Sequence, residues 1–95
     1  MSARLTLPTI HLNGTSQQAL AEQLEIARIA LGVAVDAVVE AQPNGRDYYP
    51  QGPDAFQRAQ NEHNARVTAL QKVLAELHTI HESIALWPHY VQEVP

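Results

Sequence analysis

The sequence contains no cysteine, so neither a disulfide nor a thiolate metal site can hold the chain together. Aromatic residues make up only 5% of it. They are Tyr48, Tyr49, Phe56, Trp87 and Tyr90. A chain of 95 residues is expected to form one domain that buries a modest share of its surface. Its stability must therefore come from helix packing or from association between copies.

Basic residues are also few. Six lysines and arginines stand against ten aspartates and glutamates, which gives a net charge of −4. A protein that binds nucleic acid polymers needs a basic surface to displace counterions, so we expect no such partner. A few local arginines can still hold a small anionic ligand.

Long apolar runs are missing as well. The N-terminal residues MSARLTLPTIHL have no sustained apolar core and no cleavage site of small residues, so we expect no signal peptide. No run is long enough to span a bilayer, and we expect no membrane partner. The cytoplasm is the expected location.

Residues 15–42 have the periodicity of a helix that begins near Thr15 or Ser16, both good N-cap residues. One apolar stripe repeats at spacings of three and four: Leu20, Leu24, Ala27, Leu31, Ala34 and Val38. A second set recurs on nearly the opposite face: Ile26, Ile29, Val33 and Ala37. Two apolar faces predict two partners, a second helix of the same chain and another subunit. The alternative is that the N-terminal arm covers the second set.

Residues 54–87 predict a second helix, with Asp54 as N-cap and Gln57 at the capping-box position. Its apolar stripe is heptad-like: Phe56, Ala59, His63, Val67, Leu70, Leu74, Leu77, His81, Ile84 and Trp87 or its neighbour. The expected fold is all-α, a single helical domain. It comprises an extended arm (1–14), a helix (15–42), an ordered connection (43–53), a helix (54–87) and a tail (88–95). We expect an antiparallel two-helix hairpin that assembles as a homo-oligomeric helical bundle.

The connection carries unusual chemistry. Arg46 offers a planar fork for phosphate or carboxylate, and Tyr48 and Tyr49 offer rings that can stack on a base. Asn44 and Gln51 offer amides that can read polar edges. The prolines of the connection would reduce the entropy lost on binding. Together these residues predict a site for a small, flat, anionic ligand. The alternative is a structural end cap in which Arg46 pairs with Asp47 or Asp54.

A second candidate lies at the start of the first helix, where His11, Asn13 and Thr15 surround a helix N-terminus that favours anions. The alternative is an ordinary helix cap. If two hairpins pack antiparallel, these residues of one chain can approach the connection of another and share one pocket.

Four residues of the second helix suggest metal ligands: Glu76, His78, His81 and Glu82. The chain has no HExxH motif and no second set of ligands, so we expect no metal. His63 and His81 lie on the apolar stripe, and we expect them to be buried and hydrogen-bonded or at an interface. No nucleophile motif, phosphate-binding loop or isolated carboxylate pair is present, so we expect neither catalysis nor a cofactor.

Two segments, PTIHLNGTS (residues 8–16) and PNGRDYYPQGPDAF (residues 43–56), resemble those of small helical proteins encoded by phages and prophages. The resemblance covers about a quarter of the chain and implies a role inside an infected bacterial host. Small phage proteins include inhibitors of host defence. Among these are signal sponges, oligomers that hold cyclic nucleotides or cyclic ADP-ribose signals between subunits.

By analogy with such proteins, the leading hypothesis is a non-enzymatic protein that sequesters a nucleotide-derived immune signal. Arg46 would hold phosphate, and Tyr48 and Tyr49 would stack on a base or ribose. The remaining contacts would come from Asn44, Gln51, His11, Asn13 and Thr15. Two alternatives are an anti-CRISPR-like inhibitor that blocks a host defence protein and a phage structural or assembly protein.

Overall fold

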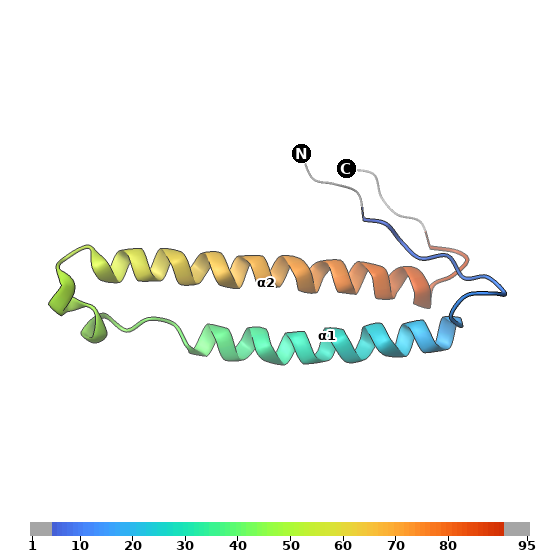
Figure 1. Ribbon diagram of the computed structural model, residues 1–95, viewed down its shortest axis with the longest axis horizontal. Coiled ribbons are helices and arrows are strands. Elements are labelled where there is room, and N and C mark those ends of the chain that lie inside the picture. Colours follow the sequence, from blue (N-terminus) through green and yellow to red (C-terminus); the bar gives the residue numbers. More distant parts are fainter. Residues whose placement is uncertain (1–4, 91–95) are drawn as a thin grey trace.

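The computed structural model describes residues 5–90, and two long helices dominate them. They are α1 (Gln17–Glu40) and α2 (Ala55–Ala85), joined through two short 3-10 turns, η1 (Gly45–Asp47) and η2 (Tyr49–Gln51). Residues 5–90 contain no strand. Figure 1 shows α1 and α2 side by side, with the connection at one end of the hairpin and the N-terminal arm at the other. The all-helical class and the helical hairpin are confirmed. Residues 91–95 of the expected tail lie outside the described part.

Both helices are shorter than the sequence predicts. Ser16, and not Thr15, is the N-cap of α1. Its backbone is extended, and its hydroxyl accepts a hydrogen bond from the Ala19 amide at 3.1 Å. At the other end α1 stops at Glu40, three residues before Pro43, because proline has no amide hydrogen to continue the helix.

The expected capping box of α2 is wrong. Asp54 precedes the helix, but its backbone is already near-helical, and its side chain makes no capping hydrogen bond. A side-chain cap needs an extended backbone at that position. Gln57 instead donates to Asn61 at 3.0 Å, one turn further along the helix. Only the backbone carbonyl of Asp54 serves the first turn, by accepting from the Arg58 amide at 3.1 Å.

Two hydrogen bonds fix the helices against each other, one at each end of the pair. The Gln17 side chain, at the start of α1, donates to the Ile84 carbonyl near the end of α2 at 2.9 Å. His63 Nε2 lies 2.7 Å from the Val38 carbonyl at the connection end. His63 is buried among the packed helices, so the expectation for this histidine is confirmed. These bonds set the register of the hairpin.

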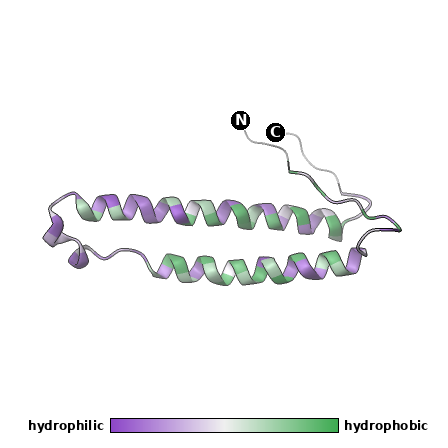
Figure 2. Cartoon of the chain, viewed as in Figure 1, coloured by the Kyte–Doolittle hydropathy of each residue, from purple (hydrophilic) through white to green (hydrophobic). Residues whose placement is uncertain are grey.

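The core of a single chain is thin. The buried hydrophobic residues of the described part are Val35, Ala55, Ala59 and Ile84. The radius of gyration is 18.6 Å, whereas a compact domain of this length has about 12 Å. The molecule measures 61 × 28 × 18 Å. Such a slender shape leaves much apolar surface in contact with solvent, and Figure 2 shows hydrophobic residues spread along the whole of α1.

The apolar stripes are largely as expected, with three corrections. Leu20, Leu24, Leu31 and Val38 are half-buried, but Ala27 and Ala34 are exposed, and Val35 is buried in their place. In α2 every stripe residue from Phe56 to Ile84 is buried or half-buried, whereas Trp87 lies beyond the helix end and is 36% exposed. The seam of α1 therefore lies to one side of the alanine positions, where larger side chains can reach α2.

The second apolar set of α1 is exposed. Ile26 is 69% exposed, Ile29 55% and Val33 67%. Residues 5–14, the described part of the expected arm, leave them uncovered, so the interpretation that the arm covers them is wrong for these residues. No helix within residues 5–90 combines the length and apolarity needed to cross a membrane.

Candidate functional site

The connection has a well-defined backbone built from its own hydrogen bonds. In η1, the amides of Asp47 and Tyr48 donate to Asn44 and Gly45 at 3.0 and 3.1 Å. In η2, the amides of Gln51 and Gly52 donate to Tyr48 and Tyr49 at 3.0 and 3.2 Å. These bonds occupy the polar backbone groups of the segment, which is how a loop holds one conformation.

Gly52 closes the connection. Its backbone has φ 109° and ψ 172°, a region that essentially only glycine occupies. This conformation turns the chain out of η2 and toward α2. Any side chain at this position would strain the turn, so the path of the connection depends on this glycine.

The two tyrosines have different environments, although they are adjacent. Tyr48 is half-buried, and its ring lies 6.5 Å from that of Phe56 at an angle of 38°. Gly45 lies against the same Phe56 ring, where an added Cβ would meet it at 3.7 Å. Tyr49 is 75% exposed. Tyr48 therefore anchors the connection to α2, and Tyr49 presents its ring outward.

Arg46 is exposed, and within residues 5–90 its guanidinium has no carboxylate within ion-pair distance. The alternative that it pairs with Asp47 or Asp54 is therefore wrong. The Arg46 backbone is fixed because its amide donates to Asn44 Oδ1 at 3.0 Å. The side-chain oxygen of Asn44 is thus occupied by a hydrogen bond within the loop, while its amide hydrogens remain available for other contacts. Gln51 is also exposed.

The second group of candidate residues lies at the opposite end of the hairpin (Figure 1). His11, Asn13 and Thr15 are exposed around a turn in which the Gly14 amide donates to the His11 carbonyl at 3.1 Å. The His11 ring folds over Gly14, where an added Cβ would lie 2.8 Å from His11 Nε2. Since α1 alone is 24 residues long, it separates the two groups by about 36 Å. One chain therefore does not bring them together.

One cluster of charged side chains joins the two helices and was not predicted from the sequence. Glu25 accepts from Arg28 Nη2 at 2.6 Å, and its other oxygen lies 3.2 Å from His81 Nε2 on α2. The hydrogen bond from Arg28 lowers the pKa of Glu25 below its ordinary value, assisted by the charges of Arg28, His81 and His78, while desolvation acts in the opposite direction. The same bond raises the pKa of Arg28. The spacing of Glu25 and Arg28 could have indicated their pairing, whereas the partnership with His81 depends on helix register.

The acidic and histidine residues of α2 do not converge. His78 lies 3.7 Å from Glu82, one turn along the same helix, while His81 faces Glu25 of α1. Within residues 5–90 no group of three or more such side chains is arranged to hold a metal ion. His81 is half-buried, and its Nε2 lies within ion-pair distance of Glu25 on the other helix.

Comparison of the chain with protein-family models, curated proteins and solved structures finds no match. Within residues 5–90, the connection combines an exposed arginine without an ion pair, an exposed tyrosine and two amide side chains on a backbone held by its own hydrogen bonds. This arrangement can bind a small anion with a flat apolar part.

Proposed function

We propose that the chain is a non-enzymatic binding protein that sequesters a small nucleotide-derived anion at its connection. One observation carries the proposal: Arg46 is exposed and has no ion pair within residues 5–90, on a connection whose backbone is held by its own hydrogen bonds and which also carries the exposed ring of Tyr49. A structural end cap would gain from neutralising such an arginine. A ligand site gains from leaving its guanidinium open to phosphate.

The chemistry of the connection suits a nucleotide-like molecule. The guanidinium of Arg46 can donate two parallel hydrogen bonds to one phosphate. Tyr49 can stack on a base, and Gln51 and the free amide hydrogens of Asn44 can contact polar edges. Tyr48 contributes by packing on Phe56. Because the loop is already ordered, little conformational entropy is lost when a ligand binds.

Assembly of several antiparallel hairpins would complete the pocket. The outward face of α1 carries exposed Ile26 and Val33, which supports contact with a second copy of the chain. In such an assembly the start of α1 in one copy can lie beside the connection of another. His11, Asn13 and Thr15 would then face Arg46 across the interface. The ligand would be enclosed between subunits, which explains how a slender hairpin could hold it.

The resemblance to phage proteins makes cyclic nucleotides and cyclic ADP-ribose derivatives the ligands to test first. Native mass spectrometry of the purified protein with a panel of these compounds gives the oligomer mass and the ligand mass together. We expect intact ligand in a fixed ratio to subunits. A hydrolysed ligand would contradict sequestration, and an oligomer that takes up none of the panel would contradict the nucleotide proposal.

Substitution of Arg46 tests the site itself. Arg46→Ala should weaken binding at least tenfold, about the 1.4 kcal/mol expected for a lost charge-assisted hydrogen bond. Arg58→Ala is the matched control, because Arg58 is also exposed but belongs to α2. Circular dichroism should show unchanged helix content in both variants. Equal affinity in Arg46→Ala and the wild type would remove the connection from the mechanism.

A protein-blocking role is the second candidate, and exposed residues at the arm end favour it. Leu12 is 97% exposed, Leu86 50% and Trp87 36%. Exposed large apolar side chains at one end of a molecule are typical of a protein interaction site. If the protein takes up no nucleotide but forms a complex of fixed ratio with one host protein, and Trp87→Ala breaks that complex, this role replaces sequestration.

A further inference from the structure

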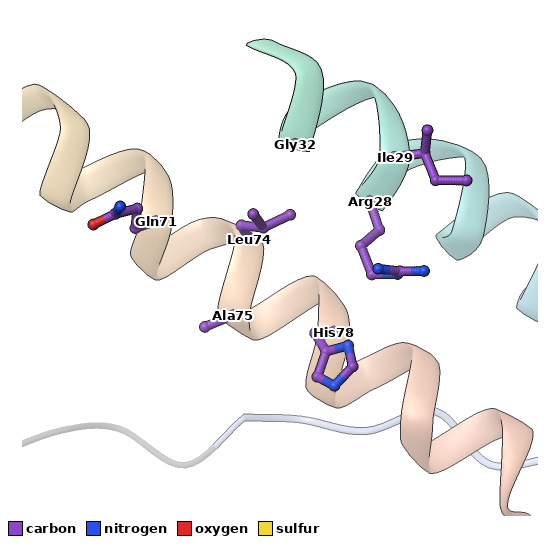
Figure 3. A pocket seen from close by; sticks show the side chains of 7 residues that line it. All are labelled: Arg28, Ile29, Gly32, Gln71, Leu74, Ala75 and His78. Atoms are coloured by element: carbon purple, nitrogen blue, oxygen red, sulfur yellow. The ribbon is translucent and has the colours of Figure 1, made fainter. Parts of the chain in front are cut away.

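A hollow of about 460 Å³ lies along one side of the helix pair, far from the connection. Its volume falls within the range of about 300–1,000 Å³ that is usual for small-molecule sites. Figure 3 shows the side chains around it, with Arg28 extending from α1 toward α2. The lining residues are Arg28, Ile29 and Gly32 of α1 and Gln71, Leu74, Ala75 and His78 of α2.

The polar part of the lining is rich in hydrogen-bond donors. Arg28 Nη2 is held by Glu25 at 2.6 Å, while Arg28 Nε is buried and has no hydrogen-bond partner among residues 5–90. Buried donors without a partner are rare and call for an explanation. His78 and Gln71 stand on the facing helix. His81 holds the second oxygen of Glu25 at 3.2 Å, so the position of Arg28 is fixed by contacts from both helices.

The apolar part of the lining comes from Ile29, Leu74 and Ala75. Ile29 is 55% exposed, although it borders the hollow. A molecule lying there would cover apolar surface that the chain itself leaves in water, and burial of that surface favours binding. The hollow thus offers an anion-binding part and a hydrocarbon-binding part side by side.

Gly32 lines the hollow on the side of α1. Glycine inside a helix is less favourable than alanine. No contact within the described chain requires it, since a Cβ built on Gly32 meets nothing within 4 Å, and its backbone is not left-handed. With glycine at this position, α1 carries no side chain on this part of the wall of the hollow.

We propose that this hollow is a second binding site, for a small amphipathic anion: a carboxylate, sulfonate or phosphate attached to an apolar body. The anionic group contacts Arg28 and His78, and the apolar body lies against Ile29 and Leu74 beside Gly32. The site shares no residue with the connection. Its ligand class also differs, because the hollow presents aliphatic side chains where the connection presents the Tyr49 ring.

The fluorescent dye 1-anilinonaphthalene-8-sulfonate is a suitable probe, since it joins a sulfonate to an apolar aromatic body. Titration of the folded wild-type protein should give saturable fluorescence. Gly32→Leu should weaken dye binding at least tenfold, because the new side chain fills the hollow. It should not unfold the chain, since leucine favours the helix more than glycine does. Gly32→Ala is the matched control and should change affinity less than about threefold, because it adds only a methyl group.

Two further variants separate the charge from the apolar surface. Arg28→Gln should lower the affinity for the dye, while its helix content should equal that of Gly32→Ala. Arg46→Ala should leave dye binding unchanged, because Arg46 lies on the connection. Retention of full dye affinity in both Gly32→Leu and Arg28→Gln would overturn the proposal. So would a loss of oligomer mass in Gly32→Leu, which would identify the hollow as a contact between copies. A dye signal that Ile26→Ser abolishes and Gly32→Leu does not would assign it to the outward face of α1.

Discussion

The two faces of α1 carry the same kinds of side chain in opposite environments. On the inward face Val35 is 6% exposed, and Leu24 and Leu31 are half-buried against α2. On the outward face Ile26 is 69% exposed and Val33 67%. Two valines, two positions apart in the chain, therefore differ in exposure by about a factor of ten.

The sequence pattern predicts two apolar faces on α1, but a single chain buries only one of them. A helix that is apolar on both faces is typical of an element with neighbours on both sides. In one hairpin α2 covers the inward face alone, and the extended shape leaves the outward face in water. Ile26 and Val33 therefore contribute no burial free energy within a single chain, and for this reason we propose that a second copy of the chain covers them.

The largest effect should follow from placing charge on the outward face. Ile26→Glu combined with Val33→Glu removes two aliphatic contacts, each expected to contribute about 1.5–3 kcal/mol when buried. We expect the association constant of the oligomer to fall by more than about 100-fold. Helix content should be retained, because both positions are exposed within the chain. Sedimentation velocity over a concentration series measures the change.

The matched control is Thr68→Glu, at an exposed position of α2 away from this face. It adds a negative charge without removing an outward apolar residue of α1, so the oligomer should persist. If Thr68→Glu dissociates the oligomer as strongly as the double variant does, the outward face of α1 is not the contact. If the wild type is monomeric at every concentration, the proposed assembly is wrong.

A smaller effect should distinguish the two valines in stability. Val35→Ala removes two buried methyl groups and should lower the free energy of unfolding by about 2 kcal/mol, through lost transfer free energy and the space left behind. This loss should be the same at all protein concentrations. Val33→Ala should reduce stability only to the extent that copies associate, so its effect should shrink on dilution. Urea unfolding at several protein concentrations measures both.

If dilution affects the stability of the two valine variants alike, the proposed difference between the inward and outward faces of α1 is contradicted. An equal, concentration-independent loss in Val33→Ala would mean that another part of the same chain covers the outward face in solution. A negligible loss in Val35→Ala would mean that the packing of α1 on α2 contributes little to stability.

Most of the fold can be predicted from local patterns in the sequence. Hydrophobic periodicity places both helices, and α1 begins one residue after Ser16 and ends three residues before Pro43. The errors have physical causes. Ala27 and Ala34 share the spacing of the apolar stripe but are exposed, and Val35 is buried instead, so the face of α1 that packs on α2 lies to one side of the alanine positions. Asp54 has the right residue type for a cap but the wrong backbone conformation.

The candidate site was predictable in composition and not in geometry. Residue types alone indicate that Arg46 and the tyrosines are unusual, but only the structure separates Tyr48, packed on Phe56, from the outward Tyr49. The cluster of Glu25, Arg28 and His81 depends on the register between two helices. Register arises from contacts between residues distant in the chain, such as Gln17 with Ile84, and no local pattern encodes it.

The smallest expected effect concerns acidic pH and compares Glu25, at the α2-facing edge of α1, with Glu22 further outward. Hydrogen bonding from Arg28 lowers the pKa of Glu25 in the folded state. The ionised carboxylate therefore stabilises the fold above the ordinary glutamate range, about pH 4.3, and this contribution is lost as the pH falls through the lowered pKa. Glu25→Gln should lose less stability on acidification than the wild type does.

Glu22→Gln is the matched control, because the Glu22 carboxylate accepts a hydrogen bond from the neutral side chain of Gln18. Added salt should reduce the difference, since the cluster is partly exposed. Identical acid unfolding curves for Glu25→Gln and the wild type would show that the link from Arg28 through Glu25 to His81 does not help to hold the inward face of α1 on α2.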